Sequence, residues 1–438
     1  MRLYGKVLAA MLVAVFIYIA VAAQSNTEIF ITREQAGSQQ WAYPIPANGV
    51  PQLSAAPEGY TPFHIEHYGR HGSRWLIRNE DYDKPVRLLE KADKYGKLTP
   101  RGKEIFDEIR TIRNDSRGRV GELTPLGHRQ HREIATRMVH NFPEIFTAET
   151  NIDARSTTVI RCILSMANEV AEIQRLVPGI NVAIDASQTT QDTLNYAAVD
   201  SIARNASSAA RYKVKEYRAS QPKSDYFFDK MFNDRQFVAD SLGEADVFSS
   251  VYEIVVNIQS HDGYATMYDI FSAEELLNEL LAKNVNWYIT SGNTPLTNNR
   301  VPFTQRHLLA NIIASADTAM VSPHISANLR FGHESVLLPL SVLMELNNAG
   351  YETDDLSTLH SHWLCHEIFP MASNIQMVFY RRVSTDKISP DDVLVKVLLN
   401  EAEATLPIDA VDGYYYRWCD LRKYYLDKLS AFSTRFAE

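Results

Sequence analysis

The sequence PFHIEHYGRHGSR at residues 62–74 decides how the fold of this chain is interpreted. Its first part, Pro62 to Arg70, is rich in aromatic and β-branched residues and is therefore predicted to be a short strand. The strand runs directly into a turn that contains His71 and Gly72. Ligands of α/β proteins bind beyond the carboxyl ends of strands, so this turn is a plausible place for chemistry.

The turn places one titratable ring between two permanent cations. In Arg70-His71-Gly72-Ser73-Arg74 the two guanidinium groups match the oxygens of a phosphate, and the glycine lets the backbone approach a ligand. Nearby cations also favour the neutral imidazole, which is the form able to attack phosphorus. For these five residues alone, a solvated basic turn with a structural histidine is an equally good interpretation.

A second cluster, Gly332-His333-Glu334, follows a predicted strand at Ala327 to Phe331 and precedes a predicted helix at Val336 to Asn348. Transfer of a phosphoryl group from an ester needs stabilisation of the phosphate oxygens and a proton for the departing oxygen. His333 could donate a hydrogen bond to the phosphate, and Glu334 could supply the proton. The alternative is that Glu334 is only a favourable charge in the first turn of a helix.

Strands separated by helices predict the fold class: an α/β protein with a central, mostly parallel sheet, helices on both faces and an inserted helical domain. Residues 24–180 and 293–438 are assigned to the α/β core and residues 181–292 to the mainly helical insertion. The remaining predicted strands and helices are at 151–155, 158–176, 273–283, 375–382 and 393–399. Thr99 and Thr124, each followed by proline, predict two further helix starts.

Residues 1–23 are predicted to be a secretory signal peptide, because Arg2 and Lys6 precede an apolar run that ends in small residues. A retained membrane anchor is the alternative. Without this segment, 42 basic residues (44 less those two) stand against 53 acidic residues, a net charge of −11, which argues against nucleic acid as a partner. With three cysteines, at positions 162, 365 and 419, at most one internal disulfide can form. We expect an exported, periplasmic or extracellular monomer.

Taken together, the motifs resemble those of the histidine acid phosphatases, the group that contains phytases and multiple inositol polyphosphate phosphatases. The resemblance extends over nearly the whole chain after residue 23 and includes LTPLG at 123–127, MYDIF at 267–271, FGHE at 331–334 and VKVLLN at 395–400. It implies an α/β domain beside a helical domain, no metal or other cofactor, and a two-step hydrolysis of phosphate monoesters through phosphohistidine. The implied substrate is a small phosphate ester, with inositol polyphosphates preferred over simple sugar phosphates.

The same resemblance assigns roles to individual residues. His71 matches the nucleophile, and Arg70, Arg74 and His333 match groups that hold the transferred phosphate. A further arginine of the family matches Arg161, with Ser165 four residues later, although Arg155 is a rival. Glu334 is implied to be the proton donor and, beside a bound phosphate, to remain protonated in mild acid, which predicts an acidic pH optimum.

The late motif departs from the family pattern. His333-Glu334-Ser335 stands where phytases commonly have His-Asp and inositol polyphosphate phosphatases have His-Ala-Glu. The subfamily and the placement of the acid are therefore open. One alternative is an exported protein that binds phosphate ligands and has lost turnover; a mutase of the same superfamily fits poorly with export.

The rival chemistry is a metallohydrolase. The segment HSHWLCHE at residues 360–367 carries three imidazoles, a thiol and a carboxylate, and a helix there would place His362 and His366 on one face. Core or surface histidines are the preferred interpretation, because the spacing of a zinc protease is not completed.

Overall fold

The structure is a computed structural model that describes residues 21–22, 28–29, 32–45, 49, 52–194, 201–321, 325–383 and 388–436. Apart from Val21 and Ala22, the predicted signal peptide lies outside the described residues. Those two residues form β1 (Val21–Ala22), which pairs antiparallel with β2 (Glu28–Ile29). Within the described ranges, every helix is too short or too polar to span a bilayer.

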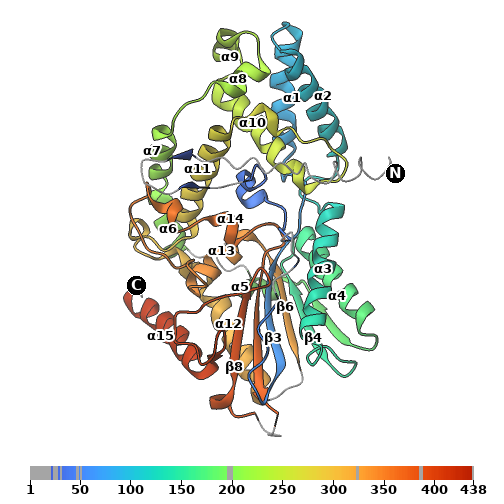
Figure 1. Ribbon diagram of the computed structural model, residues 1–438, viewed down its shortest axis with the longest axis vertical. Helices are drawn as coiled ribbons and strands as arrows, with labels where there is room; N and C mark the ends of the chain where they lie inside the picture. The colour runs from blue at the N-terminus through green and yellow to red at the C-terminus, as the bar shows by residue number, and fades with distance from the viewer. Residues whose placement is uncertain are drawn as a thin grey trace, which may run out of the picture.

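One mixed sheet of eight strands forms the lower half of the molecule in Figure 1. Its strands are β3 (Tyr60–Arg70), β4 (Asn151–Ser156), β5 (Asn181–Asp185), β6 (Ala327–Gly332), β7 (Asn374–Arg382), β8 (Leu394–Leu399), β9 (Ala402–Glu403) and β10 (Tyr416–Arg417). The order is β10-β8-β7-β3-β6-β4-β5, with β9 paired to β8. Neighbours from β3 to β5 are parallel, and β7, β8, β9 and β10 join by antiparallel pairs.

Helices cover both faces of the sheet, which confirms the predicted α/β fold class. One core packs α3 (Pro125–Asn141) and α4 (Ile160–Leu176) against the sheet through residues such as Ile134 and Ile173. The core of the opposite face is built from α12 (Arg306–Val321), α13 (Glu334–Leu343) and α15 (Trp418–Phe436). Burial of both faces explains why β7 and β8 are nearly continuous apolar runs.

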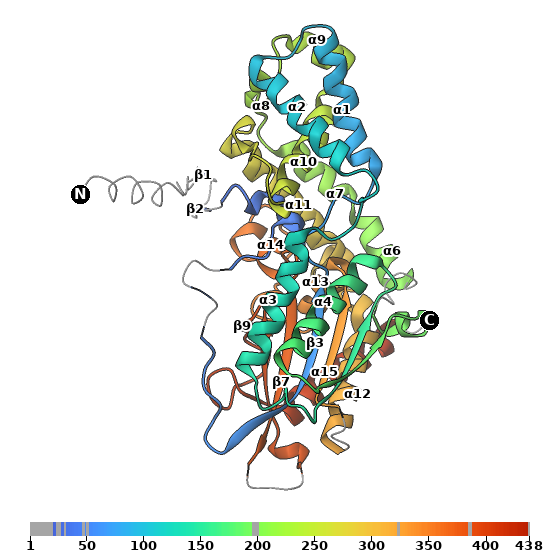
Figure 2. The ribbon, with the colours of Figure 1, turned by 90° about the vertical axis from the view of Figure 1, so that its right-hand side faces the viewer.

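A mainly helical region lies above the sheet in Figures 1 and 2 and has its own core. Its helices are α1 (Asn79–Lys94), α2 (Pro100–Asp115), α7 (Tyr212–Ser220), α8 (Tyr226–Met231), α9 (Arg235–Ser241), α10 (Glu244–Asn257) and α11 (Ala273–Ser291). Three short helices, α5 (Gln191–Leu194), α6 (Ser201–Ala210) and α14 (Cys365–Ile368), connect the two parts. The 3-10 helices are η1 (Gln35–Gln40), η2 (Gln188–Thr190), η4 (Ile258–Ser260), η5 (Tyr268–Ile270), η6 (Pro295–Thr297), η7 (Val301–Gln305), η8 (Leu359–Ser361) and η9 (Pro390–Asp392).

The structure differs from the predicted division of the chain in two places. Helices α1 and α2, assigned to the α/β core, bury Leu89 and Ile109 in the same cluster as Phe227 and Val251 of the helical region. Strand β5 begins the segment predicted to be a helical insertion. It is a five-residue edge strand whose side chains are all at least partly exposed, and its alternation consists of Val182 and Ile184 alone, which is too short a pattern to indicate a strand.

Helix starts follow the predicted capping chemistry more closely than helix ends do. Thr99 and Thr124 accept hydrogen bonds from the backbone N–H groups of Gly102 and Gly127, and Ser272 forms a capping box. Helix α11 continues past the predicted end at residue 283 to Ser291. Its buried stripe extends that far, because it packs between the helical region and the sheet layer.

Three parallel strands bring the two predicted clusters together. Arg70 at the end of β3 stands beside Gly332 at the end of β6, and Ser156 at the end of β4 stands beside Phe331. The backbone N–H of His71 donates to the carbonyl oxygen of Gly332 at 3.0 Å. The residues that follow these strands therefore meet at one edge of the sheet, where the helical region covers them.

Candidate active site

The first motif is held against the start of α3 by close backbone contact. A Cβ atom on Gly72 would lie 2.6 Å from the carbonyl oxygen of Gly127, so these two glycines can approach only without side chains. Gln130 accepts a hydrogen bond from the Ser73 backbone at 2.8 Å and donates to the Ser73 hydroxyl at 3.1 Å. Neighbouring elements thus fix the loop that carries His71.

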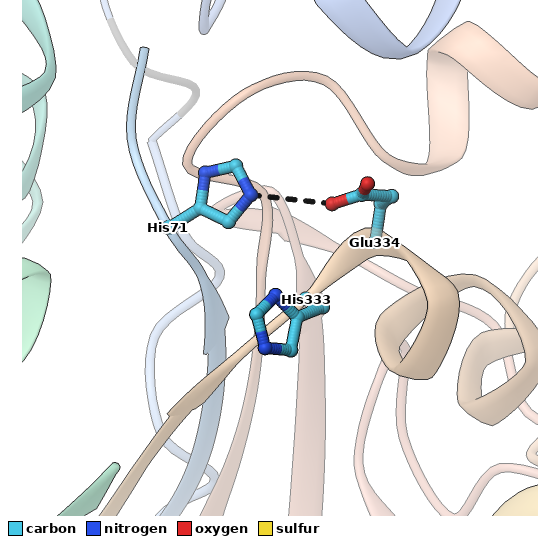
Figure 3. Close-up of side chains that lie close together, drawn as sticks. All are labelled: His71, His333 and Glu334. Atoms are coloured by element: carbon cyan, nitrogen blue, oxygen red, sulfur yellow. Dashed lines mark ion pairs between the residues drawn. The ribbon is translucent and has the colours of Figure 1, made fainter. Parts of the chain in front are cut away.

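His71 and Glu334 face each other across the site, as Figure 3 shows. His71 Nε2 and Glu334 Oε2 are 3.3 Å apart, and Arg70 Nε lies at the same distance from that oxygen. The ring of His333 is nearly perpendicular to that of His71, with centroids 5.9 Å apart. Residues from two motifs more than 250 positions apart therefore share one site.

The imidazole of His71 is arranged as a nucleophile. Its Nδ1 lies 3.0 Å from the carbonyl oxygen of Gly72, which accepts a hydrogen bond from the Nδ1–H tautomer and leaves the Nε2 lone pair facing the site. Burial, assisted by Arg70 and Arg161, holds the pKa of His71 well below its usual value despite the opposing effect of Glu334. The ring is therefore neutral at mildly acidic pH.

Glu334 is ionised in the ligand-free protein. Burial by itself raises its pKa, but the charges of Arg70 and Arg74 outweigh burial and hold the pKa well below the usual value. The pKa of His333 is lowered to about 4, chiefly by burial. For Glu334 to act as the expected proton donor, its pKa must be raised by a further negative charge in the site. A bound phosphate would supply that charge.

Three guanidinium groups, those of Arg70, Arg74 and Arg161, act electrostatically on His71 or on Glu334. Arg70 is fully buried and donates through Nη1 to the carbonyl oxygen of Phe369 at 2.7 Å, whereas its Nε and Nη2 have no hydrogen-bond partner among the described residues. In the same described ranges, the buried Nε atoms of Arg74 and Arg161 also lack a hydrogen bond. Burial, together with Arg74 and Arg161, lowers the pKa of Arg70 to about 10. Apart from the contact of Arg70 Nε with the Glu334 carboxylate, these crowded donors lack a partner and favour an anion.

The structure separates Arg161 from its rival Arg155. Arg161, on α4, is close enough to lower the pKa values of both His71 and His333. Its neighbour Ser165 accepts a hydrogen bond from the Gly72 backbone at 3.3 Å. Arg155 instead pairs with Asp153 at 2.6 Å and lines a separate cavity of about 360 Å³. All six predicted site residues therefore lie in one cluster, and their roles stay predictions.

The same cluster could be mistaken for a metal site. Ligand atoms of His71, His333 and Glu334 lie within 4.8 Å of one another. However, Arg70 already contacts the Glu334 carboxylate, and Arg74 and Arg161 add two further positive charges. This surrounding charge disfavours a cation and favours an anion.

The second metal hypothesis is wrong in its geometry. Helix α14 covers only Cys365–Ile368, so His362 precedes it and does not share a helix face with His366. His362 stacks on Tyr351, the His366 ring contacts Trp41, and Cys365 Sγ lies 3.2 Å from Ser38 Oγ. Among the described residues, this segment forms no group of converging metal ligands.

Sequence interpretation missed the residues that hold His333. The Thr157 hydroxyl lies 3.2 Å from His333 Nε2, the Cys162 thiol lies beside the ring, and the Tyr68 hydroxyl accepts a hydrogen bond from the His333 backbone at 3.4 Å. Thr157 immediately follows β4, so its position at a strand end was the available signal.

Basic residues outside the cluster are mostly paired. Arg101 pairs with Asp269, Arg129 pairs with Asp262, and the largely exposed Arg78 pairs with Asp81. These arginines therefore provide little independent support for a polyphosphate substrate.

Comparison with known proteins agrees with the fold and with the motifs. A family model described as the histidine phosphatase superfamily (branch 2) matches residues 70–400. Comparison with curated proteins gave no match.

Solved structures with the same fold include two groups of phosphatases. A Bifidobacterium longum multiple inositol polyphosphate phosphatase in complex with phosphate shares 17% identity, with a TM-score of 0.74 over 90% of this chain and 98% of that one. The phytase from D. castellii shares 13% identity, with a TM-score of 0.66 over 94% and 91% of the two chains. Hafnia alvei phytase in complex with myo-inositol hexakis sulphate shares 12%, with a TM-score of 0.52 over 85% and 98%. At these identities the likeness shows the fold.

Proposed function

The chain belongs to branch 2 of the histidine phosphatase superfamily and is a phosphatase, and we propose that it hydrolyses phosphate monoesters in two steps through a phosphohistidine at His71. The observation that carries this proposal is the group of three arginines, Arg70, Arg74 and Arg161, whose charges act on His71 or Glu334 and whose Nε atoms lack a hydrogen bond among the described residues. A phosphoryl group would fill these donors and stand in front of the nucleophile.

In the first step, the Nε2 lone pair of His71 attacks phosphorus and the bond to the ester oxygen breaks. Glu334, protonated when the phosphate is bound, gives its proton to the departing oxygen. The arginines and His333 hold the phosphoryl oxygens, which carry the developing negative charge. The alcohol leaves, and His71 carries the phosphoryl group.

In the second step, water attacks phosphorus while the Glu334 carboxylate accepts a proton from that water. The nitrogen–phosphorus bond breaks and its electron pair returns to His71. Inorganic phosphate is released, and both residues recover their starting state. One carboxyl group thus serves first as acid and then as base.

Trapping the intermediate tests this mechanism. Purified protein would be mixed with a phosphate ester labelled in its phosphoryl group and quenched in alkaline denaturant, because phosphohistidine is unstable in acid. We expect label on His71 of the wild type and none on the His71→Asn variant. Rapid turnover by the wild type without any labelled protein would contradict the covalent route.

We infer that the preferred substrates are inositol polyphosphates. The inference is supported by solved structures of the same fold whose complexes contain phosphate or inositol hexasulfate. Broad activity on sugar phosphates is the second candidate. Phosphate release from inositol hexakisphosphate, compared with a hexose phosphate at equal concentration, separates the two: a higher kcat/KM for the hexose phosphate would favour the second.

Export and a monomeric state complete the proposal. Support for export comes from the composition of residues 1–23. Amino-terminal sequencing of the protein from a cell expressing the full chain, together with fractionation, would test cleavage and location. Light scattering of the purified protein would test the monomer.

A further inference from the structure

The proposed role of His333 is to donate a hydrogen bond to the phosphate, and the tautomer of its ring decides which nitrogen can donate. A neutral imidazole carries a single N–H, so its second nitrogen must be satisfied by a hydrogen-bond donor if the first is to donate to a ligand. The pKa of His333 is lowered to about 4, chiefly by burial, so the neutral form prevails at mildly acidic pH. Which nitrogen carries the proton therefore decides whether His333 can hold a phosphate oxygen.

The orientation of the ring assigns a different task to each nitrogen. Nε2 lies 3.2 Å from the hydroxyl oxygen of Thr157. In Figure 3 one ring nitrogen of His333 lies on the side of His71 and Glu334, and the other points away from them. With Nε2 occupied by Thr157, Nδ1 is the nitrogen left to face the site.

Thr157 is held where its hydroxyl can donate to His333 Nε2. Its backbone N–H donates to the carbonyl oxygen of Phe331 at 3.0 Å, which extends the pairing of β4 with β6 and fixes the residue directly beside His333. The side chain is buried, and its hydroxyl proton can rotate toward Nε2.

Cys162 holds the same ring from another direction. Its sulfur is almost equidistant from the two ring nitrogens, at 3.7 and 3.8 Å, and its S–H donates to the carbonyl oxygen of Gly332 at 3.2 Å. Burial raises the pKa of this thiol to about 12, so it stays uncharged. Cys162 therefore packs against the ring without choosing its tautomer.

We propose that Thr157 is a positioning residue that donates its hydroxyl proton to His333 Nε2 and thereby keeps the ring in the Nδ1–H tautomer needed to bind phosphate. The proposal rests on the proposed function for its effect on catalysis, but the tautomer itself does not. It predicts that Nδ1 of His333 already carries the proton in the ligand-free protein, so the ring need not change its tautomer when phosphate binds.

Nitrogen-15 NMR of histidine-labelled protein tests the tautomer directly. The signals of His333 would be assigned by their loss in the His333→Gln variant. We expect the wild type to show the Nδ1–H form at pH 6, and Thr157→Val, which keeps the shape of the side chain and removes its hydroxyl, to lose that preference. An Nε2–H ring in the wild type, donating to Thr157, would overturn the proposal.

Kinetic variants supply the second readout. Thr157→Val should weaken inhibition by inorganic phosphate and lower kcat/KM by about 10- to 100-fold, by analogy with the loss of a partner that orients a metal-ligating histidine. Thr157→Ser should restore both values, and Cys162→Ala should retain the wild-type tautomer. If Thr157→Val does not fold, Thr157→Ala and the wild-type spectrum still decide the question.

The two proposals fail in different ways. A wild-type protein that releases no phosphate from any ester would refute the proposed function, whatever the tautomer. An active wild type whose Thr157→Val variant keeps the same tautomer and the same affinity for inorganic phosphate would refute only the role of Thr157.

Discussion

Replacing Glu334 by glutamine should slow catalysis while tightening the binding of phosphate. Glutamine keeps the size of the side chain but can neither donate a proton to the leaving oxygen nor repel a bound anion. General acid catalysis contributes about 10²- to 10⁴-fold, so kcat/KM for an alkyl phosphate, which reports the transfer to His71 and not the later attack of water, should fall by this factor. For p-nitrophenyl phosphate, whose leaving group needs no proton, the loss should be far smaller.

The size of the binding effect follows from the geometry of the pair. Glu334 Oε2 lies 3.3 Å from His71 Nε2, so a phosphorus in front of that nitrogen stands close to the carboxylate. Two unit charges about 4 Å apart repel by about 4 kcal/mol at the effective dielectric constant of such sites, or up to about a thousandfold in affinity. The wild type avoids this repulsion by taking up a proton with the ligand.

This coupling between phosphate and a proton gives a signature in the pH dependence of inhibition by inorganic phosphate. Once the pH exceeds the second pKa of phosphate, above which the dianion prevails in solution, the wild-type inhibition constant should rise about tenfold per pH unit, because one proton must be bound with the dianion. In Glu334→Gln the constant should become nearly independent of pH there. The gain in affinity should therefore grow as the pH rises.

A second glutamate near the site provides the control. The charge of Glu253 also raises the pKa of Arg74, but the Glu253 carboxylate pairs with the Lys283 ammonium at 2.7 Å. Glu253→Gln should retain the wild-type dependence on leaving group and pH. An equal loss of kcat/KM on alkyl and aryl esters in Glu334→Gln, with an unchanged slope of phosphate inhibition, would refute the acid role of Glu334.

The other predictions concern charge, metal and stability. Arg161→Ala should lower kcat/KM by about 10²- to 10³-fold, as expected for a lost donor to a transition-state oxygen. Arg155→Ala should change kcat/KM little. Equal losses of kcat/KM in the two variants, measured by steady-state kinetics, would contradict the assignment of Arg161 to the phosphate site. Activity should persist after dialysis against a chelator. Loss of activity, with recovery when a metal ion is added, would support the metallohydrolase hypothesis instead. Burial lowers the pKa of His67 to about 4, so its contribution to stability is present above the unfolded value of about 6.5 and is lost, by about 3 kcal/mol, as pH falls to about 4. Urea denaturation across this range should show that slope in the wild type and a smaller one in His67→Leu; equal slopes would show that His67 is not responsible.

Much of the fold was predictable because the decisive signals are local. The strand before Arg70, the strand before Gly332 and the threonine caps of α2 and α3 depend on a few neighbouring residues each, and the structure places them as the sequence predicts. That both strands end in titratable residues also indicated a shared site. Parallel strands in one sheet align their carboxyl ends, so the sequence alone predicts that the two motifs lie close together.

Other features depend on contacts between distant segments, which local patterns do not encode. The apolar faces of α1 and α2 fit a helix on a sheet as well as a helix in a bundle, and only packing against distant residues, such as Phe227 and Val251, decides between the two arrangements. The pairing of His333 with Thr157 is likewise invisible in the sequence, because it arises from the neighbouring positions of β4 and β6.

The site exists only when the central strands are paired in one register. Gly332 must lack a side chain, because a Cβ atom there would stand 2.0 Å from the Tyr68 hydroxyl, and that hydroxyl accepts the backbone N–H of His333. Burying Arg70 and His71 with unpaired polar atoms costs stability, a cost that the apolar layers on both faces of the sheet offset. The protein therefore holds a costly anion site at the carboxyl ends of its central strands, where the packed layers on both faces of the sheet keep the site preorganised for a phosphate.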